Sequence, residues 1–91
     1  MKTVIINGSD IHGKEELHDI LQAKLGLGES YGRNLDALWD GVTGYISMPL
    51  TIQWLHFEAS RAVLGEYADQ LLELLREAEE ELEQFTLEVK M

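Results

Sequence analysis

The sequence predicts an α/β protein in which a three-stranded parallel sheet is covered by about four helices, in the order β-α-α-β-α-α-β. Three short segments rich in β-branched and aromatic residues have the composition of strands. Two longer stretches between them carry apolar residues at the helical period, and each is long enough for two helices. Strands joined by connections of this length run parallel, and such crossovers are right-handed.

The first strand is expected at residues 2–6, where the sequence KTVII is followed by the turn signal Asn7–Gly8. A helix is expected at residues 14–25, because glycines close a segment that has a 3.6-residue apolar period. The apolar residues of this helix are Leu17, Ile20, Leu21 and Leu25.

A second helix is expected to begin after Asn34, whose side chain is a good N-cap, and to end at Gly41 and Gly44. Its apolar stripe consists of Leu35, Leu38 and Val42. The middle strand follows at residues 49–55, the sequence PLTIQWL, which Pro49 opens.

The second half of the chain is expected to hold two helices and the last strand. A short helix over residues 56–65 is stopped by its final glycine, and the longest helix runs over residues 67–84. The inner face of the long helix carries Leu71, Leu72, Leu75, Ala78 and Leu82. The sequence FTLEV, residues 85–89, has the composition of the strand that completes the sheet.

Size, composition and charge narrow the class of protein. Ninety-one residues with 45% apolar content fit one domain that spans residues 1–91. Seventeen acidic residues against seven basic ones give a net charge of −10, which disfavours nucleic acid and membrane surfaces and favours a basic partner. The chain has no cysteine, and its first residues lack the apolar run of a signal peptide or membrane span, so we expect cytoplasmic residence.

The segment YGRNLDALWDGVTG, residues 31–44, places two carboxylates on one helical face. Asp36 and Asp40 lie one turn apart and form a polar stripe with Thr43. This polar stripe lies roughly 140° around the helix from the apolar stripe, and Trp39 lies between the two stripes. Like charges at this spacing cost a helix about 0.2–0.5 kcal/mol, and the helix dipole also disfavours the second carboxylate. Local helix stability does not explain the pattern. Taken alone, Asp40 also fits a solvated surface carboxylate, and Trp39 fits a residue at the edge of the core.

The longest helix repeats this acidic pattern. Its acidic residues at spacings of about four are Asp69, Glu73, Glu77 and Glu80 or Glu81. A solvated face is the ordinary interpretation of such a stripe. Two acidic helices side by side would nevertheless offer a patch complementary to lysine and arginine on another protein.

The catalytic and metal-binding interpretations are weaker. The three histidines, His12, His18 and His56, have no ligand spacing, and we expect them at turns or on the surface. Asp36 and Asp40 have the chemistry to share a proton or hold a divalent cation, but a helix face without a pocket disfavours both uses. The segment after the first strand lacks the spacing of a nucleotide-binding loop. We therefore expect no enzyme activity, no cofactor, no metal and no small-molecule substrate.

The stretches YGRNLDALWDGVTGY, MPLTIQWLHFEAS and LLREAEEE are similar to the barstar family of intracellular ribonuclease inhibitors. The resemblance extends from VIING to the last strand without large insertions, and its most specific part is the segment Tyr-Gly-x-Asn-Leu-Asp-Ala-Leu-Trp-Asp. It implies a barstar-like fold and a protein that plugs the active site of a secreted, basic ribonuclease. In that family a loop and the second helix form the plug, and helix carboxylates occupy the place of substrate phosphate.

The resemblance also implies roles for individual residues. Asp40 would be the central phosphate mimic that pairs with arginine and lysine of the ribonuclease, with Asp36 and Glu77 beside it. The partner-binding residues that match the family pattern are Tyr31, Gly32, Asn34, Asp36, Trp39, Asp40, Thr43, Gly44 and Glu77.

This chain departs from the family pattern at four positions around the plug. Ser30 replaces a tyrosine, Arg33 an acidic residue, Gly41 a cysteine and Tyr45 a tryptophan. The exchange at Arg33 suggests a target with a different charge at its rim. The family has a cis peptide bond before the proline of the middle strand, which implies the same for Met48–Pro49.

The function expected from the sequence is inhibition of a basic ribonuclease by occlusion. The alternative is an acidic adaptor or antitoxin-like protein that binds a basic non-nuclease partner through the same patch. A metal-dependent hydrolase built on the paired aspartates is a third and weaker interpretation.

Overall fold

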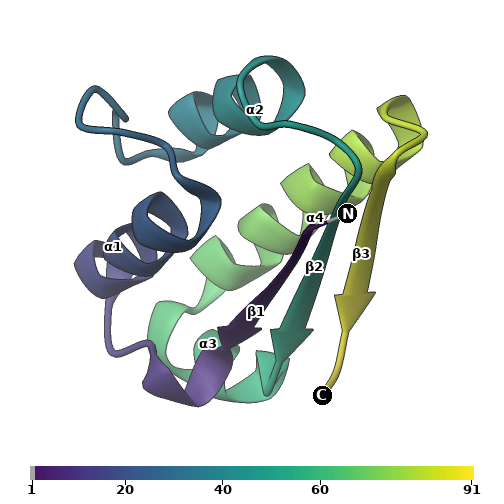
Figure 1. Cartoon of the computed structure of the whole chain (residues 1–91). Coiled ribbons are helices and arrows are strands. Elements are labelled where there is room, and N and C mark those ends of the chain that lie inside the picture. The colour runs from purple at the N-terminus through teal and green to yellow at the C-terminus, as the bar shows by residue number, and fades with distance from the viewer. Residues whose placement is uncertain (1) are drawn as a thin grey trace.

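The computed structural model describes residues 2–91 and confirms the predicted α/β fold (Figure 1). The strands are β1 (Lys2–Asn7), β2 (Leu50–Leu55) and β3 (Phe85–Val89). The helices are α1 (Lys14–Leu25), α2 (Leu35–Gly44), α3 (Phe57–Leu64) and α4 (Glu66–Glu81), and a short 3₁₀ helix, η1 (Gly8–Asp10), follows β1. Apart from this short element, the order along the chain is the predicted β-α-α-β-α-α-β.

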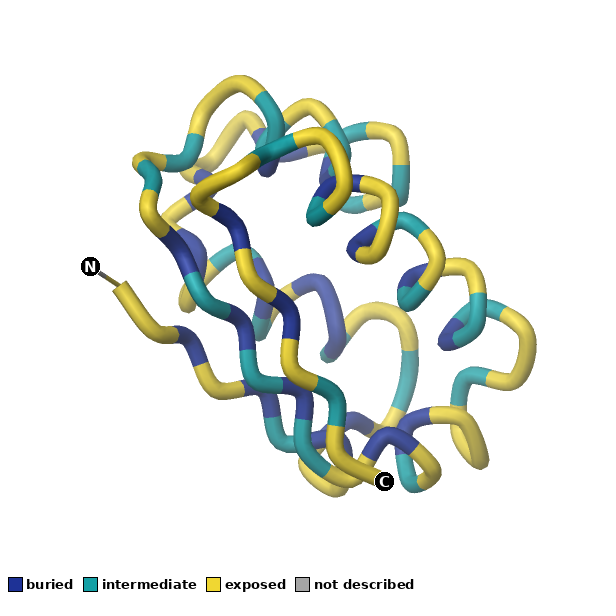
Figure 2. The backbone as a smooth tube through the Cα atoms, turned by 90° about the vertical axis from the view of Figure 1, so that its right-hand side faces the viewer, coloured by how far each residue is buried: buried dark blue, intermediate teal, exposed yellow. Residues whose placement is uncertain are grey.

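The three strands pair in parallel in the order β1-β2-β3. Val4 lies opposite Ile52, which lies opposite Leu87, so a row of buried side chains crosses the whole sheet. Along each strand buried residues alternate with more exposed ones, as the colours in Figure 2 show. The apolar core therefore lies on one face of the sheet.

Both connections between strands cross this apolar face (Figures 1 and 2). Leu17 and Leu21 of α1 are buried there, as are Leu71 and Leu75 of α4. Burial of each such side chain stabilises the fold by about 1.5–3 kcal/mol. Because the two crossovers share one face, α2 of the first packs against α4 of the second.

The carboxyl end of α4 differs from the prediction. The apolar period predicts a helix to residue 84, whereas α4 ends at Glu81. Leu82 has an extended backbone and packs against the core, and its carbonyl accepts a hydrogen bond from the Phe85 amide. Leu82 therefore belongs to the apolar stripe as predicted, but it does so from the turn that leads into β3.

The end of α2 also differs. The helix passes through Gly41, which the sequence marks as an end, and stops at Gly44. A Cβ atom at Gly41 would lie 2.8 Å from Leu27 Cδ2, so the glycine allows the preceding loop to lie close to the helix. The chain leaves α2 through Tyr45 and enters β2 across the Met48–Pro49 bond, which is cis as the family resemblance implies.

Gly8 lies where η1 meets the beginning of α3. A Cβ atom at this position would lie 2.2 Å from the His56 carbonyl oxygen and 2.4 Å from Ser60 Oγ. Ser60 Oγ also accepts a hydrogen bond of 3.0 Å from the indole N–H of Trp54, the largest fully buried side chain. The absence of a side chain at Gly8 therefore protects the polar contact of the central tryptophan.

Replacement of Gly8 by alanine is expected to lower the free energy of unfolding by about 1–3 kcal/mol, because the new methyl group overlaps backbone atoms. Urea unfolding monitored by tryptophan fluorescence measures this change. The same replacement at Gly44 is the control, since a Cβ atom there would meet no atom within 4 Å. Equal stability of the two variants would contradict the close approach at Gly8.

Candidate protein-binding site

The structure holds α2 at the surface with its apolar side inward. The Asn34 side chain accepts a hydrogen bond of 2.8 Å from the Ala37 amide and caps the helix, as predicted. Leu38 is completely buried beneath the helix. Asp36 and Asp40 project from the other side and are exposed.

The outward carboxylates differ from other acidic side chains in their contacts. Within residues 2–91, neither an ion pair nor a side-chain hydrogen bond engages the carboxylates of Asp36, Asp40 or Glu77. By contrast, Asp19 and Asp69 each pair with an arginine. The negative charge on α2 and on the neighbouring part of α4 is therefore available to another molecule.

A groove of about 300 Å³ lies between α2 and α4. Its lining residues are Asp36, Trp39, Gln70, Glu73, Leu74 and Glu77. The structure thus brings together three residues of the predicted set, Asp36, Trp39 and Glu77. The sequence predicts that Glu73 lies on an acidic face but does not identify it as a site residue. Its spacing of four from Glu77 was the available signal.

A hollow of about 270 Å³, separate from the groove, lies on the other side of the exposed face of α2. Its lining residues are Leu27, Ser30, Tyr31, Gly32, Ala37, Asp40, Gly41 and Tyr45. Three of the four departures from the family pattern, Ser30, Gly41 and Tyr45, meet in this hollow. Asp36 and Asp40 therefore stand on a ridge between the groove and the hollow.

The remaining predicted residues of α2 differ in what they expose. Trp39 is half-buried, packs against the core and lines the groove. Thr43 is half-buried, and its hydroxyl donates a hydrogen bond of 2.7 Å to the Trp39 carbonyl. Gly44 is exposed at the end of the helix, next to Tyr45, which is 67% exposed.

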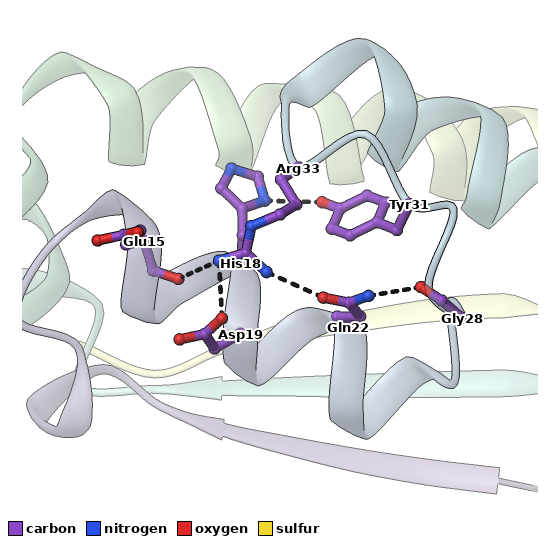
Figure 3. Close-up of polar contacts among 7 residues, drawn as sticks. All are labelled: Glu15, His18, Asp19, Gln22, Gly28, Tyr31 and Arg33. Atoms are coloured by element: carbon purple, nitrogen blue, oxygen red, sulfur yellow. Dashed lines mark hydrogen bonds and ion pairs between the residues drawn. The ribbon is translucent and has the colours of Figure 1, made fainter.

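Tyr31 belongs to a buried polar cluster that was not predicted (Figure 3). Its hydroxyl lies 2.7 Å from Nδ1 of His18, and the Tyr67 hydroxyl lies 2.7 Å from Nε2 of the same ring. His18 is 3% exposed, so the expectation that it lies at a turn or on the surface is wrong. Its place three residues before Leu21, on the apolar stripe of α1, was the available signal.

Burial disfavours charge on this cluster. It lowers the pKa of His18, and the positive charge of Arg33 lowers it further. Burial also raises the pKa of Tyr31 to about 12, with a smaller effect from Tyr67, whose own pKa rises through burial. A neutral imidazole donates through one nitrogen and accepts through the other, so both hydroxyls find a partner. The cluster ties Tyr31, in the loop before α2, to α1 and α4.

Across residues 2–91, no three histidine, cysteine, aspartate or glutamate side chains are grouped so as to hold a metal ion. No helix described in that range is long and apolar enough to cross a membrane.

His12 and His56 are exposed, as predicted.

The chain is similar to a known protein family and to a protein of Bacillus subtilis. The whole chain, residues 1–91, matches the family model described as Barstar (barnase inhibitor). A protein of Bacillus subtilis (strain 168) named "Putative ribonuclease inhibitor YrdF" is 51% identical over 82 residues, which cover 90% of each chain. The family match includes every residue of the ridge, the groove and the hollow.

The lowered pKa of His18 predicts that the stability of the protein depends on pH. The pKa of His18 is lower in the folded protein than its ordinary value of 6.5. Below pH 6.5 the unfolded chain therefore binds a proton at His18 more readily than the folded protein does. The free energy of unfolding is therefore expected to fall as the pH drops below 6.5 and to level off below the folded-state pKa. Urea unfolding between about pH 8 and about pH 5 measures the slope, and His18→Gln should flatten it.

The control is His56→Asn, which removes an exposed imidazole and should keep the pH dependence of the parent protein. Identical slopes for His18→Gln and the parent protein would show that the buried cluster does not couple to protonation.

Proposed function

Because this chain belongs to the barstar family, we propose that it inhibits a basic ribonuclease by covering the active site of that enzyme. The proposed contact surface is the outer face of α2, the loop before it and the adjoining part of α4. In this mechanism the protein performs no chemistry itself. It acts by keeping RNA away from the catalytic groups of its partner.

The observation that carries the proposal is the pair of outward carboxylates on α2, which have no partner within residues 2–91. Enzymes that bind RNA phosphates use cationic donors such as arginine and lysine, and arginine grips carboxylate and phosphate with the same two-pronged geometry. Asp40 is proposed to take the place of a phosphate, with Asp36 and Glu77 beside it. Glu73 extends this acidic surface along the groove.

Rigidity supports the same proposal. The carboxylates stand on a helix that is capped at one end and anchored by the buried side chain of Leu38, so little order has to be gained on binding. The groove and the hollow are proposed to receive side chains of the ribonuclease around the charged ridge. The other proposed contact residues are Tyr31, Gly32, Asn34, Trp39, Thr43 and Gly44.

The charge of the whole molecule favours a basic partner. A net charge of −10 attracts a positively charged protein at long range and so accelerates association. An acidic adaptor that binds a basic protein of another kind would use the same charge, but the family match favours a ribonuclease.

Asp40→Ala is expected to weaken inhibition by at least about 30-fold, because loss of one partner from a buried charge pair costs about 2–5 kcal/mol. The measurement is titration of the protein into an RNA-cleavage assay, first with barnase and then with basic ribonucleases secreted by the source organism. Glu58→Ala is the control: it removes the same charge from an exposed position on α3, at the other end of the sheet (Figure 1).

Two outcomes would contradict the proposed function. One is that the parent protein inhibits none of these ribonucleases. The other is that Asp40→Ala inhibits as strongly as Glu58→Ala, which would remove Asp40 from the centre of the contact.

A further inference from the structure

The loop between α1 and α2, residues 26–34, is fastened to one face of α1. The α1 residues that hold it are Glu15, His18, Asp19 and Gln22, whose spacing of three or four places them side by side on the helix. The loop carries Ser30, Tyr31 and Gly32, which line the hollow beside Asp40. Its position therefore fixes one wall of the hollow and the point where α2 begins.

Arg33 makes most of these attachments (Figure 3). Its Nη1 donates a hydrogen bond of 2.9 Å to Gln22 Oε1. Its Nη2 donates to the Glu15 carbonyl at 2.9 Å and to Asp19 Oδ1 at 2.7 Å. Gln22 in turn donates through Nε2 to the Gly28 carbonyl. A single guanidinium thus connects the last part of the loop to α1 and, through Gln22, to the first part of the loop.

The backbone of Arg33 has an unfavourable conformation. Its φ angle is 57°, in the left-handed region that residues with a side chain seldom occupy. The next residue is Asn34, whose side chain caps α2. The three hydrogen bonds of the guanidinium therefore stabilise an unfavourable turn immediately before the helix that carries Asp36 and Asp40.

The same contacts change the interpretation of the charge on Arg33. The sequence suggests that this arginine reflects the rim charge of the target. In the structure the Arg33 side chain is 34% exposed, and its guanidinium is directed at α1, where its ionic partner is Asp19 of the same chain. The positive charge of Arg33 therefore forms an ion pair within the protein.

We propose that Arg33 is a positioning residue, which locks the α1–α2 loop in the conformation that binds the partner and thereby presents the carboxylates of α2. The proposal rests on the proposed function for what is bound, whereas the locking itself belongs to the free protein. If the loop samples other conformations, only the fraction of molecules in the binding conformation can bind the partner. The apparent association rate is then proportional to that fraction.

If only net charge mattered, loss of Arg33 would raise the association rate. Arg33→Ala makes the net charge one unit more negative than −10, and a more acidic protein associates faster with a basic partner. Lys24→Ala makes the same change of charge from an exposed position on α1, and within residues 2–91 the Lys24 side chain makes none of the hydrogen bonds that hold the loop. The two variants therefore separate positioning from electrostatic attraction.

The first measurement is stopped-flow association with barnase or, if barnase is not bound, with the ribonuclease identified by the inhibition assay. Arg33→Ala should associate about tenfold more slowly than the parent protein and retain this defect at high salt, whereas Lys24→Ala should associate as fast or faster. Arg33→Lys should fall between them, because one ammonium group cannot satisfy three separated acceptors. Association of Arg33→Ala at the rate of Lys24→Ala would overturn the proposal.

The second measurement needs no partner. In the free protein, the Leu27 amide donates to the Gln22 carbonyl at 3.0 Å and the Tyr31 amide donates to the Gly28 carbonyl at 3.4 Å. Arg33→Ala should accelerate hydrogen exchange of these two amides about tenfold relative to the Ile52 amide in the central strand. Unchanged exchange at the loop, or equal acceleration at Ile52, would overturn the locking even if no ribonuclease is found. Failure of the inhibition assay alone would instead contradict the proposed function.

Discussion

Parallel pairing of three strands in chain order is the constraint on which this structure depends. Each pair of neighbouring parallel strands needs a long crossover, and here both crossovers lie on the same face of the sheet (Figure 1). The helices α2 and α4 therefore become neighbours although β2 and α3 separate them in the chain. The groove in which Asp36 meets Glu77 exists because of that arrangement.

The position of the candidate site follows from the same constraint. Ligand sites of parallel sheets usually lie beyond the carboxyl ends of the strands. The helix α2 lies instead near their amino ends (Figure 1), and it carries the exposed acidic ridge. Such a surface suits insertion into the cavity of another protein. The arginines do not neutralise this surface. Arg33, Arg61 and Arg76 pair with acidic residues outside α2, so the carboxylates of α2 have no ionic partner within residues 2–91.

The sequence predicts whatever depends on neighbours in the chain. Residue composition predicts the strands and the apolar period predicts the helices. A helical wheel puts Asp36 and Asp40 on the face opposite the buried Leu38. Contacts between distant segments were not predictable in this way. The partners of His18 are hydroxyls 13 and 49 residues along the chain, so its burial in a polar cluster had no local signal beyond its place on the apolar stripe. The attachment of Arg33 to α1 likewise depends on how the loop folds back.

Competition with a 3′-mononucleotide tests most directly whether the carboxylates of α2 occupy a phosphate site. The nucleotide fills the phosphate site of the ribonuclease, and binding of this protein is measured as the nucleotide concentration is raised. If the two compete, the apparent Kd rises in proportion to the nucleotide concentration above its own Kd. A Kd that does not change, or a complex that contains enzyme, nucleotide and this protein together, would contradict the proposed mechanism.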